Sequence, residues 1–449
     1  MDLSEAMFTA PEMAACFSSA TAVQRMLDFE AALARAEASA GVIPMAAAEA
    51  IAARCRAELF DLAALYREGA VTGTPAIPLV RMLTALVDEE GRGFVHWGAT
   101  SQDAIDTGMM LQMRDGLDLL IGRLLDVARG CAALADRHRR TPMAGRTLLQ
   151  HAVPIPFGLK AARWLGLTTR VVRRLRDLRE RALVVQLGGA AGTLASLGTE
   201  GARVMDLLAS ELELAAPDLP WPAERDRIAE IAAALGIAAG AMAKIATDLA
   251  LLSQTEVGEA STRAAGAAGR SSTMPHKRNP VDAMTAAAAR LAIGIVPTVL
   301  GGLAQEHERA AGGWQAEWDA LPRLFRLTAG AVESVHRAVD GLEVDPARMR
   351  ANLDLTRGLI LAEALMMALA PRLGREQAYR LVQRASDRTA ADGTPLSEVA
   401  ASDEQIRSVL SAQEIARVFD PSAYMGSADR FIERALEEFR AVTDRAGSG

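Results

Sequence analysis

Apolar residues recur at helical spacing along most of this chain. The stretch from Ala22 to Ala40 places apolar side chains one turn apart among charged ones, which predicts an amphipathic helix that Gly41 should end. Helical spacing also runs from Asp103 to about Arg140 and again from Glu224 to Glu259. The pattern therefore predicts a protein built mainly from helices.

The stripe between Glu224 and Glu259 predicts one long helix. At 1.5 Å per residue its helix would be on the order of 50 Å long, which is more than a compact globule of this size needs. Helices of that length usually form bundles, often between subunits. Gly236 and Gly240 would weaken an isolated helix by up to about 1 kcal/mol each, so we interpret both as close-packing points.

The run VTGTPAIPLV, from Val71 to Val80, interrupts the helical pattern with glycine and proline. It is interpreted as a loop that enters another helix. Such a loop either faces a substrate or simply connects two helices, and the pattern alone does not decide between these roles. After about Leu342 the apolar spacing returns to shorter helices.

Composition supports the helical prediction and restricts the function. Half of the 449 residues are hydrophobic but only 4% are aromatic, so the core must be built from aliphatic residues, which favour helices. A net charge of -7 argues against a nucleic-acid or membrane surface and leaves room for a local basic pocket. Cys16, Cys55 and Cys131 are scattered without a paired spacing, which argues against both a disulfide framework and a zinc cluster.

The N-terminus and the hydropathy pattern indicate where the protein works. The opening MDLSEAMFTAPEM carries acids where a signal peptide would carry bases, and charges interrupt the apolar windows before they reach spanning length. We therefore expect a soluble cytoplasmic protein without a membrane or nucleic-acid partner.

The string GRSSTMPHKRNP, from Gly269 to Pro280, concentrates reactive groups more than any other. Beside fixed positive charge, a hydroxyl can exchange a proton with a carbon acid, while Lys277 and Asn279 hold the carboxylate that accepts the developing charge. The alternative is a basic loop that caps a helix.

This string closely resembles the signature loop of the fumarase/aspartase superfamily. Two more blocks stand where that resemblance requires them, HWGATSQDAIDT from His96 to Thr107 and GRTLLQHAVPIPFG from Gly145 to Gly158. The similarity continues through QLGGAAGTLASLG and QTEVGE, so it covers essentially the whole chain. It implies an all-α fold in three lobes, 1–105, 106–342 and 343–449, whose central long-helix bundle carries the signature loop at 261–280. It also implies a homotetramer in which three subunits share each active site.

The resemblance assigns roles to individual residues. Ser271 resembles the mobile-loop residue that removes or delivers the proton at carbon, and Ser272 is the less favoured candidate. Lys277 and Asn279 resemble carboxylate ligands. The substrate-anchoring stretch would contain His96, Thr100, Ser101 and Gln102. Polar residues lining the site would be Thr147 and Gln150, and His151 either joins them in catalysis or faces a neighbouring helix. The role of His276 stays open.

Two departures from the superfamily pattern indicate the reaction. Eliminating members carry a histidine and a glutamate where this chain has Leu148 and Met284, and both replacements are apolar. A lyase needs an acid for a poor leaving group, whereas lactonisation adds a carboxylate that is already ionised at neutral pH. The sequences of residues 26–44 and 305–322 also resemble those of the bacterial 3-carboxy-cis,cis-muconate cycloisomerases. The resemblance thus implies a cycloisomerase of aromatic catabolism that closes a small polyanionic muconate into a lactone.

Alternatives and partners follow from the same residues. Arg270 stands where the cycloisomerases usually have glycine, so it either binds a further anionic substituent, as in a sulfomuconate, or faces solvent. The rival enzyme is an adenylosuccinate lyase, and the rival class is a non-catalytic structural protein on the same fold. No metal or organic cofactor is expected, because the sequence has no Cys/His/Asp cluster and no Gly-rich nucleotide loop.

Overall fold

The computed structural model describes residues 7–262, 273–274 and 282–444. These residues divide into two compact units, each drawn from three separate stretches of the chain. The first unit comprises Met1–Leu124, Val171–Ala243 and Met284–Ser334, and the second comprises Leu125–Arg170, Lys244–Ala283 and Val335–Gly449. The long helices pass from one unit into the other.

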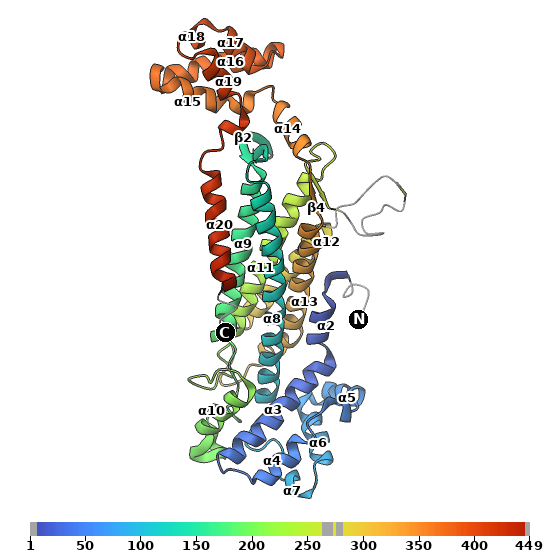
Figure 1. Ribbon diagram of the computed structural model, residues 1–449. Coiled ribbons are helices and arrows are strands. Elements are labelled where there is room, and N and C mark those ends of the chain that lie inside the picture. Colours follow the sequence, from blue (N-terminus) through green and yellow to red (C-terminus); the bar gives the residue numbers. More distant parts are fainter. Residues whose placement is uncertain (1–6, 263–272, 275–281, 445–449) are drawn as a thin grey trace. The chain divides into compact units, whose positions relative to one another are not determined.

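The long helices are labelled in Figure 1, and two of them cover apolar stripes predicted from the sequence. They are α8 (Ser101–Arg137), α9 (Phe157–Arg181), α11 (Asp226–Leu252), α12 (Asp282–Gly301) and α13 (Gly313–Asp340). The helix expected from Asp103 to about Arg140 is α8. The helix expected from Glu224 to Glu259 is α11, but it ends at Leu252. A turn containing Gly258 at φ 60° follows, and it brings Glu259 to the start of a strand.

The first unit is organised around α3 (Ser19–Ser39), which confirms the helix predicted at 22–40. Ser18 caps its start by accepting a hydrogen bond from the N–H of Thr21, and Gly41 follows its end at φ 79°. One side of α3 packs into an aliphatic core with the next helices of the chain, and the other side packs against α10. The surrounding elements are α2 (Pro11–Cys16), α4 (Met45–Ala52), η1 (Ala57–Leu59), α5 (Leu62–Thr72), α6 (Ala76–Leu86), α7 (Glu89–Arg92), η2 (Ala195–Glu200) and α10 (Gly201–Leu212).

Glycines set the spacing between long helices in the first unit. A Cβ at Gly236 of α11 would lie 2.8 Å from Val296 of α12, so only glycine permits this approach and the predicted close packing is confirmed. Gly240 differs, because its Cβ would meet Ile293 at an ordinary 3.8 Å. A Cβ at Gly116 of α8 would lie 2.9 Å from Phe325, which fixes the approach of α8 to α13.

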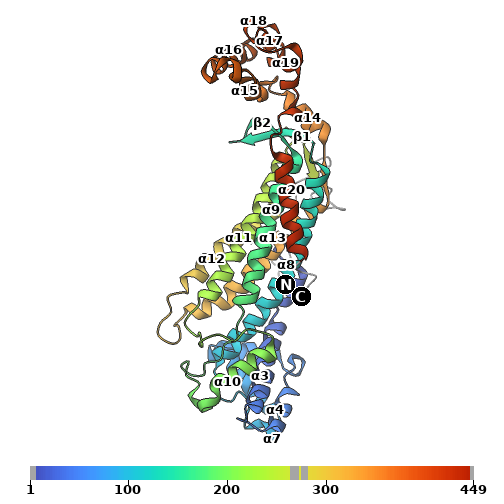
Figure 2. The same cartoon turned by 60° about the vertical axis from the view of Figure 1, so that its left-hand side comes forward.

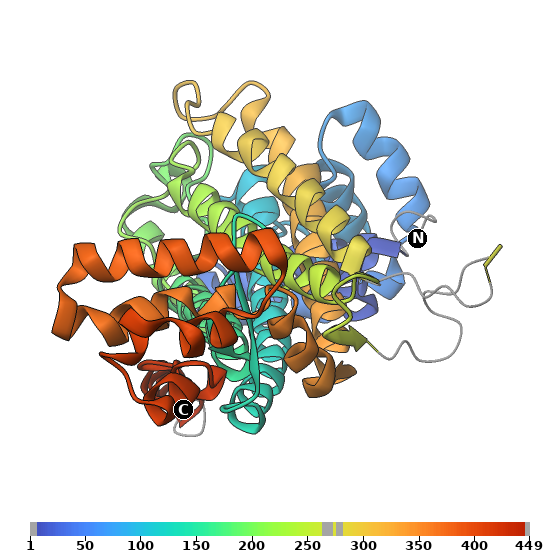
Figure 3. The same ribbon diagram turned by 90° about the horizontal axis from the view of Figure 1, so that it is seen from above.

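The second unit combines short strands with the C-terminal helices. Strands β1 (Pro142–Thr147) and β2 (Gln150–Pro156) form an antiparallel hairpin, and β3 (Ala260–Thr262) pairs antiparallel with β4 (Leu342–Val344). In Figure 3 the helices α15 and α16 lie side by side, and both contribute to one aliphatic cluster. The C-terminal elements are α14 (Pro346–Asp354), η3 (Leu359–Leu361), α15 (Ala362–Leu373), α16 (Arg375–Asp392), α17 (Leu396–Ser402), α18 (Glu404–Arg407), α19 (Ala412–Val418), η4 (Pro421–Ala423) and α20 (Ala428–Asp444).

Two helices are unusually apolar in composition. By length and composition, α11 and α12 could each cross a membrane, although core helices of soluble proteins also have this character. In α11 61% of the apolar window is buried inside the protein, but in α12 only 28% is buried. Much of the apolar surface of α12 is therefore left uncovered by its own chain.

Candidate active site

The predicted substrate-anchoring stretch leads into the N-terminus of α8 in the first unit. Asp103 accepts a hydrogen bond from the N–H of Thr100 at 3.0 Å, and its carboxylate also accepts from the N–H groups of Gly188 and Gly189. Burial raises the pKa of Asp103 to about 7, despite these three hydrogen bonds and the nearby His96. Asp103 thus ties the start of α8 to a distant loop and leaves Thr100 and Ser101 partly exposed.

His96 lies at a strained position beside this helix terminus. Its φ is 57°, and its Nδ1 lies 2.6 Å from a carboxylate oxygen of Glu30, which is buried on α3. Burial by itself would lower the pKa of His96, but Glu30 and Asp103 raise it above its ordinary value. The arrangement favours an imidazolium, which suits a site for a polyanion.

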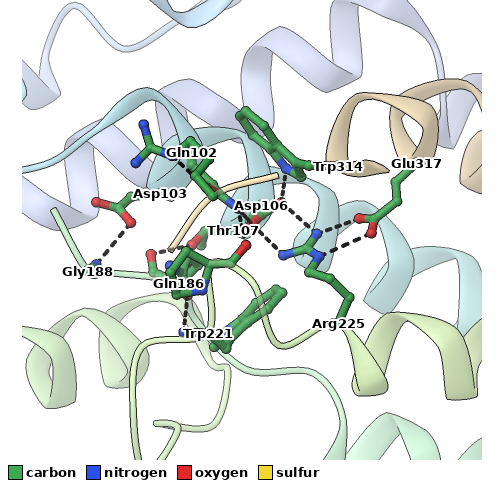
Figure 4. Close-up of polar contacts among 12 residues, drawn as sticks. Gln102, Asp103, Asp106, Thr107, Gln186, Gly188, Trp221, Arg225, Trp314 and Glu317 are labelled. Atoms are coloured by element: carbon green, nitrogen blue, oxygen red, sulfur yellow. Dashed lines mark hydrogen bonds and ion pairs between the residues drawn. The ribbon is translucent and has the colours of Figure 1, made fainter. Parts of the chain in front are cut away.

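Gln102, also predicted to anchor substrate, is fully buried. Its amide nitrogen donates to Asp106 at 3.1 Å and to the carbonyl of Pro222 at 2.7 Å, and its amide oxygen accepts from Arg309 at 3.0 Å. Figure 4 shows this side chain directed into a network of buried polar groups. In this structure all three hydrogen bonds of the Gln102 amide therefore go to protein groups, and Arg309 holds its oxygen.

Arg309 is a candidate that the sequence reasoning did not identify. It precedes α13, and its guanidinium reaches back to the oxygens of Thr100 and Ala190, each at 3.3 Å. The side chain is exposed, so it adds a positive charge directly over the predicted anchoring stretch. The only available signal was its place directly after Glu306, His307 and Glu308 in QEHERAAGG, a context that looks like a solvated charge run.

The second unit holds the other predicted polar residues of the site on the β1–β2 hairpin. Thr147 pairs with Gln150 at its tip, and both are exposed. His151 is partly buried, its Nδ1 has no hydrogen-bond partner among the described residues, and burial together with Arg146 lowers its pKa. A neutral imidazole with a free ring nitrogen can accept a proton, which agrees with the catalytic role proposed for His151.

Two exposed leucines form the turn of this hairpin. Leu148 has φ 47° and is 96% exposed, and Leu149 has φ 65° and is 83% exposed. Figure 2 shows β2 extending away from the helices of its unit. Backbone strain of this kind concentrates at functional sites, because elsewhere a residue such as glycine or asparagine would relieve it. Among the described residues of its own unit, Leu148 lies in no apolar pocket.

A buried ion pair holds β1 next to the tip of the hairpin. Arg146 makes two hydrogen bonds to Glu259, at 2.7 and 2.8 Å, and Asn352 of α14 donates to the same carboxylate at 2.8 Å. Glu259 is fully buried, so its charge depends on these partners. Glu259 must leave the direction of the helix to reach Arg146 and Asn352, which is why α11 ends before the QTEVGE block.

The signature loop falls largely outside the described residues. Arg270, Ser271, Ser272, Lys277 and Asn279 all lie there, as does His276. Their predicted roles stay predictions. Within the described ranges, no group of three or more His, Cys, Asp or Glu side chains could hold a metal ion.

Comparisons with known proteins identify the family. The model of the lyase family matches residues 5–293, and that of the adenylosuccinate lyase C-terminus matches residues 358–435. A 3-carboxy-cis,cis-muconate cycloisomerase of Bradyrhizobium diazoefficiens is 49% identical over 435 residues, which cover 96% of each chain. The cycloisomerase of the same name from Pseudomonas aeruginosa is also 49% identical, with 98% of this chain and 97% of the other covered.

A solved structure agrees with these sequence matches. The 3-carboxy-cis,cis-muconate lactonizing enzyme from Pseudomonas putida superposes with a TM-score of 0.92 at 45% identity, and the match covers 98% of this chain and 99% of the other. The expected all-α fold is confirmed by this likeness. The chain therefore belongs to the lyase family of the fumarase/aspartase superfamily, together with the 3-carboxy-cis,cis-muconate cycloisomerases.

Proposed function

We propose that this protein is a cycloisomerase that converts 3-carboxy-cis,cis-muconate, or a close analogue, to the corresponding muconolactone. The main support is identity of 49% to a cycloisomerase of that name over nearly the full length of both chains. The reaction is intramolecular. A carboxylate oxygen attacks an alkene carbon, the electron pair of the alkene moves into the neighbouring carboxylate group, and protonation of the adjacent carbon completes the lactone.

The described part of the site is suited to holding such a substrate. The start of α8 presents N–H groups and a partial positive charge, and Thr100 and Ser101 add hydroxyl donors. His96 and Arg309 add two cationic groups beside that helix start. Several carboxylates of one small molecule could be neutralised there, which would orient the attacking oxygen toward the alkene.

We place the proton transfer in the signature loop, by resemblance. Ser271 would deliver the proton while Lys277 and Asn279 bind the carboxylate that carries the enolate charge. Replacing Ser271 by Ala should lower turnover by about 10²-fold or more, because general acid catalysis is worth roughly that much. The matched variant Ser272→Ala should keep most activity. The opposite ranking of the two variants would transfer the role to Ser272.

The apolar residues at Leu148 and Met284 support lactonisation over elimination. A carboxylate nucleophile needs no base, and ring closure releases no leaving group that would require an acid. Adenylosuccinate cleavage needs such an acid, so this chain is poorly equipped for it.

One assay distinguishes the candidate functions. Loss of muconate absorbance is followed with 3-carboxymuconate and 3-sulfomuconate in parallel, and adenylosuccinate cleavage is measured as a control. We expect rapid loss with 3-carboxymuconate. A higher kcat/KM for the sulfonated substrate that disappears in Arg270→Gly would assign Arg270 to the substituent. Efficient adenylosuccinate cleavage without lactonisation would overturn the proposal, and inactivity on all three would favour the structural alternative.

We further propose a soluble, cytoplasmic homotetramer in which three subunits contribute to each site. The exposed apolar side chains of α12 support this assembly, since soluble monomers rarely expose a large continuous apolar patch.

A further inference from the structure

The orientation of the Gln102 amide is fixed completely by its surroundings. An amide nitrogen has two hydrogens, and both are used here, one on Asp106 and one on the carbonyl of Pro222. The amide oxygen is therefore obliged to point the other way, where it accepts from Nε of Arg309 at 3.0 Å. Rotation of the amide by 180° would place its nitrogen against this guanidinium and lose all three hydrogen bonds.

The carboxylate of Asp106 is also fixed by its hydrogen bonds. Both of its oxygens accept from Arg225, at 2.7 and 3.0 Å, and one also accepts from Nε1 of Trp314 at 2.8 Å. Arg225 in turn binds both oxygens of Glu317 and stacks 4.8 Å from the ring centre of Trp221. Figure 4 shows Arg225 between the two carboxylates.

The charges of this network are unbalanced. Among the described residues, Asp106 and Glu317 pair with one cation, Arg225, and all three side chains are at most 4% exposed. Carboxylates buried in excess of their cations are costly unless a further cation lies nearby. Arg309 supplies it from the surface, bound to Asp106 through the neutral amide of Gln102.

We propose that Asp106 and Arg225 are positioning residues that act through Gln102 to hold Arg309 over Thr100. This inference rests on the proposed function, in which Arg309 contacts a substrate carboxylate. Neither positioning residue is exposed enough to contact substrate. Each one acts on Arg309 only through the hydrogen bonds that Asp106 and Gln102 make. Nη1 of Arg309 makes no hydrogen bond to the described residues, and this exposed group is the one offered to the substrate.

A double-mutant cycle tests this role. Gln102→Met keeps the size of the side chain and removes the oxygen that holds Arg309. We expect KM for 3-carboxymuconate to rise about tenfold with kcat changed less than about twofold, because the lost contact binds substrate and transition state alike. In the Arg309→Ala background, Gln102→Met should leave KM unchanged within about twofold, because no guanidinium remains to be positioned.

Two more variants separate positioning from simple stabilisation. In Asp106→Asn the new amide N–H₂ faces Arg225 in either orientation, together with Gln102 or with Trp314, so the hydrogen bonds that fix this network are lost. The variant should therefore raise KM as Gln102→Met does, and again only when Arg309 is present. Glu317→Gln is the matched control. It weakens the separate pair between Arg225 and Glu317 but keeps both hydrogen bonds from Arg225 to Asp106, so it should lower Tm and leave KM unchanged.

The outcomes separate the inference from the proposed function. Equal rises in KM with and without Arg309 would show that the network only stabilises the fold and would overturn the inference, as would a folded Gln102→Met variant with wild-type KM. A wild-type protein that fails to lactonise contradicts the proposed function alone. The same cycle is then measured as Kd for citrate, a non-reacting tricarboxylate, with the same criteria.

Discussion

The charge of His96 depends on one buried carboxylate. Glu30 lies 2.6 Å from its Nδ1, and together with Asp103 it outweighs the burial that would otherwise lower the pKa of the imidazole. If the imidazolium binds a substrate carboxylate, activity should decline as the pH rises through this raised pKa. Glu30→Gln removes the main opposing charge, so burial then dominates and the pKa of His96 falls.

We therefore expect the basic limb of the kcat/KM profile to move to lower pH in Glu30→Gln, with the acidic limb little changed. Initial rates measured from about pH 5.5 to about pH 9 would show this. Glu343→Gln, an exposed glutamate of β4, is a suitable control for the loss of one negative charge. An unchanged basic limb in Glu30→Gln would mean that His96 is structural.

Glu37 gives a second prediction at this scale, for stability. It is fully buried about two helical turns beyond Glu30, both of its oxygens lack a partner in the described structure, and burial raises its pKa to about 9. The unfolded chain releases this proton near pH 4.5, the ordinary value, while the folded chain keeps it. Stability is therefore lost as the pH rises between these values, by up to about 1.4 kcal/mol per pH unit.

Glu37→Gln is uncharged at every pH and has almost the same shape. Its Tm should match that of the wild type near pH 5 and exceed it by several degrees near pH 8, as measured by calorimetry. The comparison of the two pH values is an internal control for packing changes. A gain of the same size at both pH values would show that the carboxyl is not the cause.

At the scale of elements, local periodicity predicted helices well but not their ends. The start and end of α3 lie within three residues of expectation because a serine cap and a glycine stop are local signals. The end of α11 was missed by seven residues, because it depends on Glu259 meeting Arg146 and Asn352 from distant segments. A periodic pattern carries no information about such partners.

The site shows the same division between local and long-range information. Motif resemblance located the stretch at His96 to Gln102, but the sequence could not show that the amide of Gln102 is buried or that Arg309 binds it from 207 residues away. Likewise, no local signal showed that Glu30 would pair with His96. Positions that depend on one short motif could be predicted, whereas those that depend on two distant segments could not.

The β1–β2 hairpin gives a prediction at this scale. Leucine at positive φ costs roughly 1–2 kcal/mol per residue, and two-residue turns of this kind prefer Asn-Gly. Replacing Leu148 and Leu149 together by Asn and Gly should therefore raise Tm. If the tip contacts the reacting molecule, the same change should lower kcat/KM by about tenfold or more, since it removes two exposed apolar side chains.

Thermal unfolding and steady-state kinetics of that variant give both values. The control is Val71→Ser, which removes another highly exposed apolar side chain but relieves no turn. A hairpin variant that is more stable and fully active would show that the strained leucines serve neither binding nor catalysis.

At the scale of the whole molecule, the order of the sequence differs from the order of packing. Each compact unit draws on three stretches, because α8, α9, α11 and α13 belong partly to one unit and partly to the other. The lobes expected at 1–105, 106–342 and 343–449 are contiguous in sequence and stay a prediction. Because each unit is drawn from three separate stretches, neither should fold when it is expressed from one stretch alone.

Assembly is the remaining prediction at this scale. Leu291, Ile293 and Leu300 of α12 are each more than 40% exposed, and Ile237 of α11 is 48% exposed, all within the first unit. Burying a large apolar side chain contributes on the order of 2 kcal/mol, so repeated copies of this surface should stabilise an oligomer strongly.

We expect light scattering to give the mass of a homotetramer. Ile293→Glu should dissociate it, because a charge in an apolar interface is costly. It should also abolish activity if subunits share each site. Tyr379→Glu, at a position on α16 that is 57% exposed against 46% for Ile293, should do neither. A monomer with full activity would contradict both the tetramer and the shared site, whereas an inactive but intact tetramer in Ile293→Glu would contradict only the proposed interface.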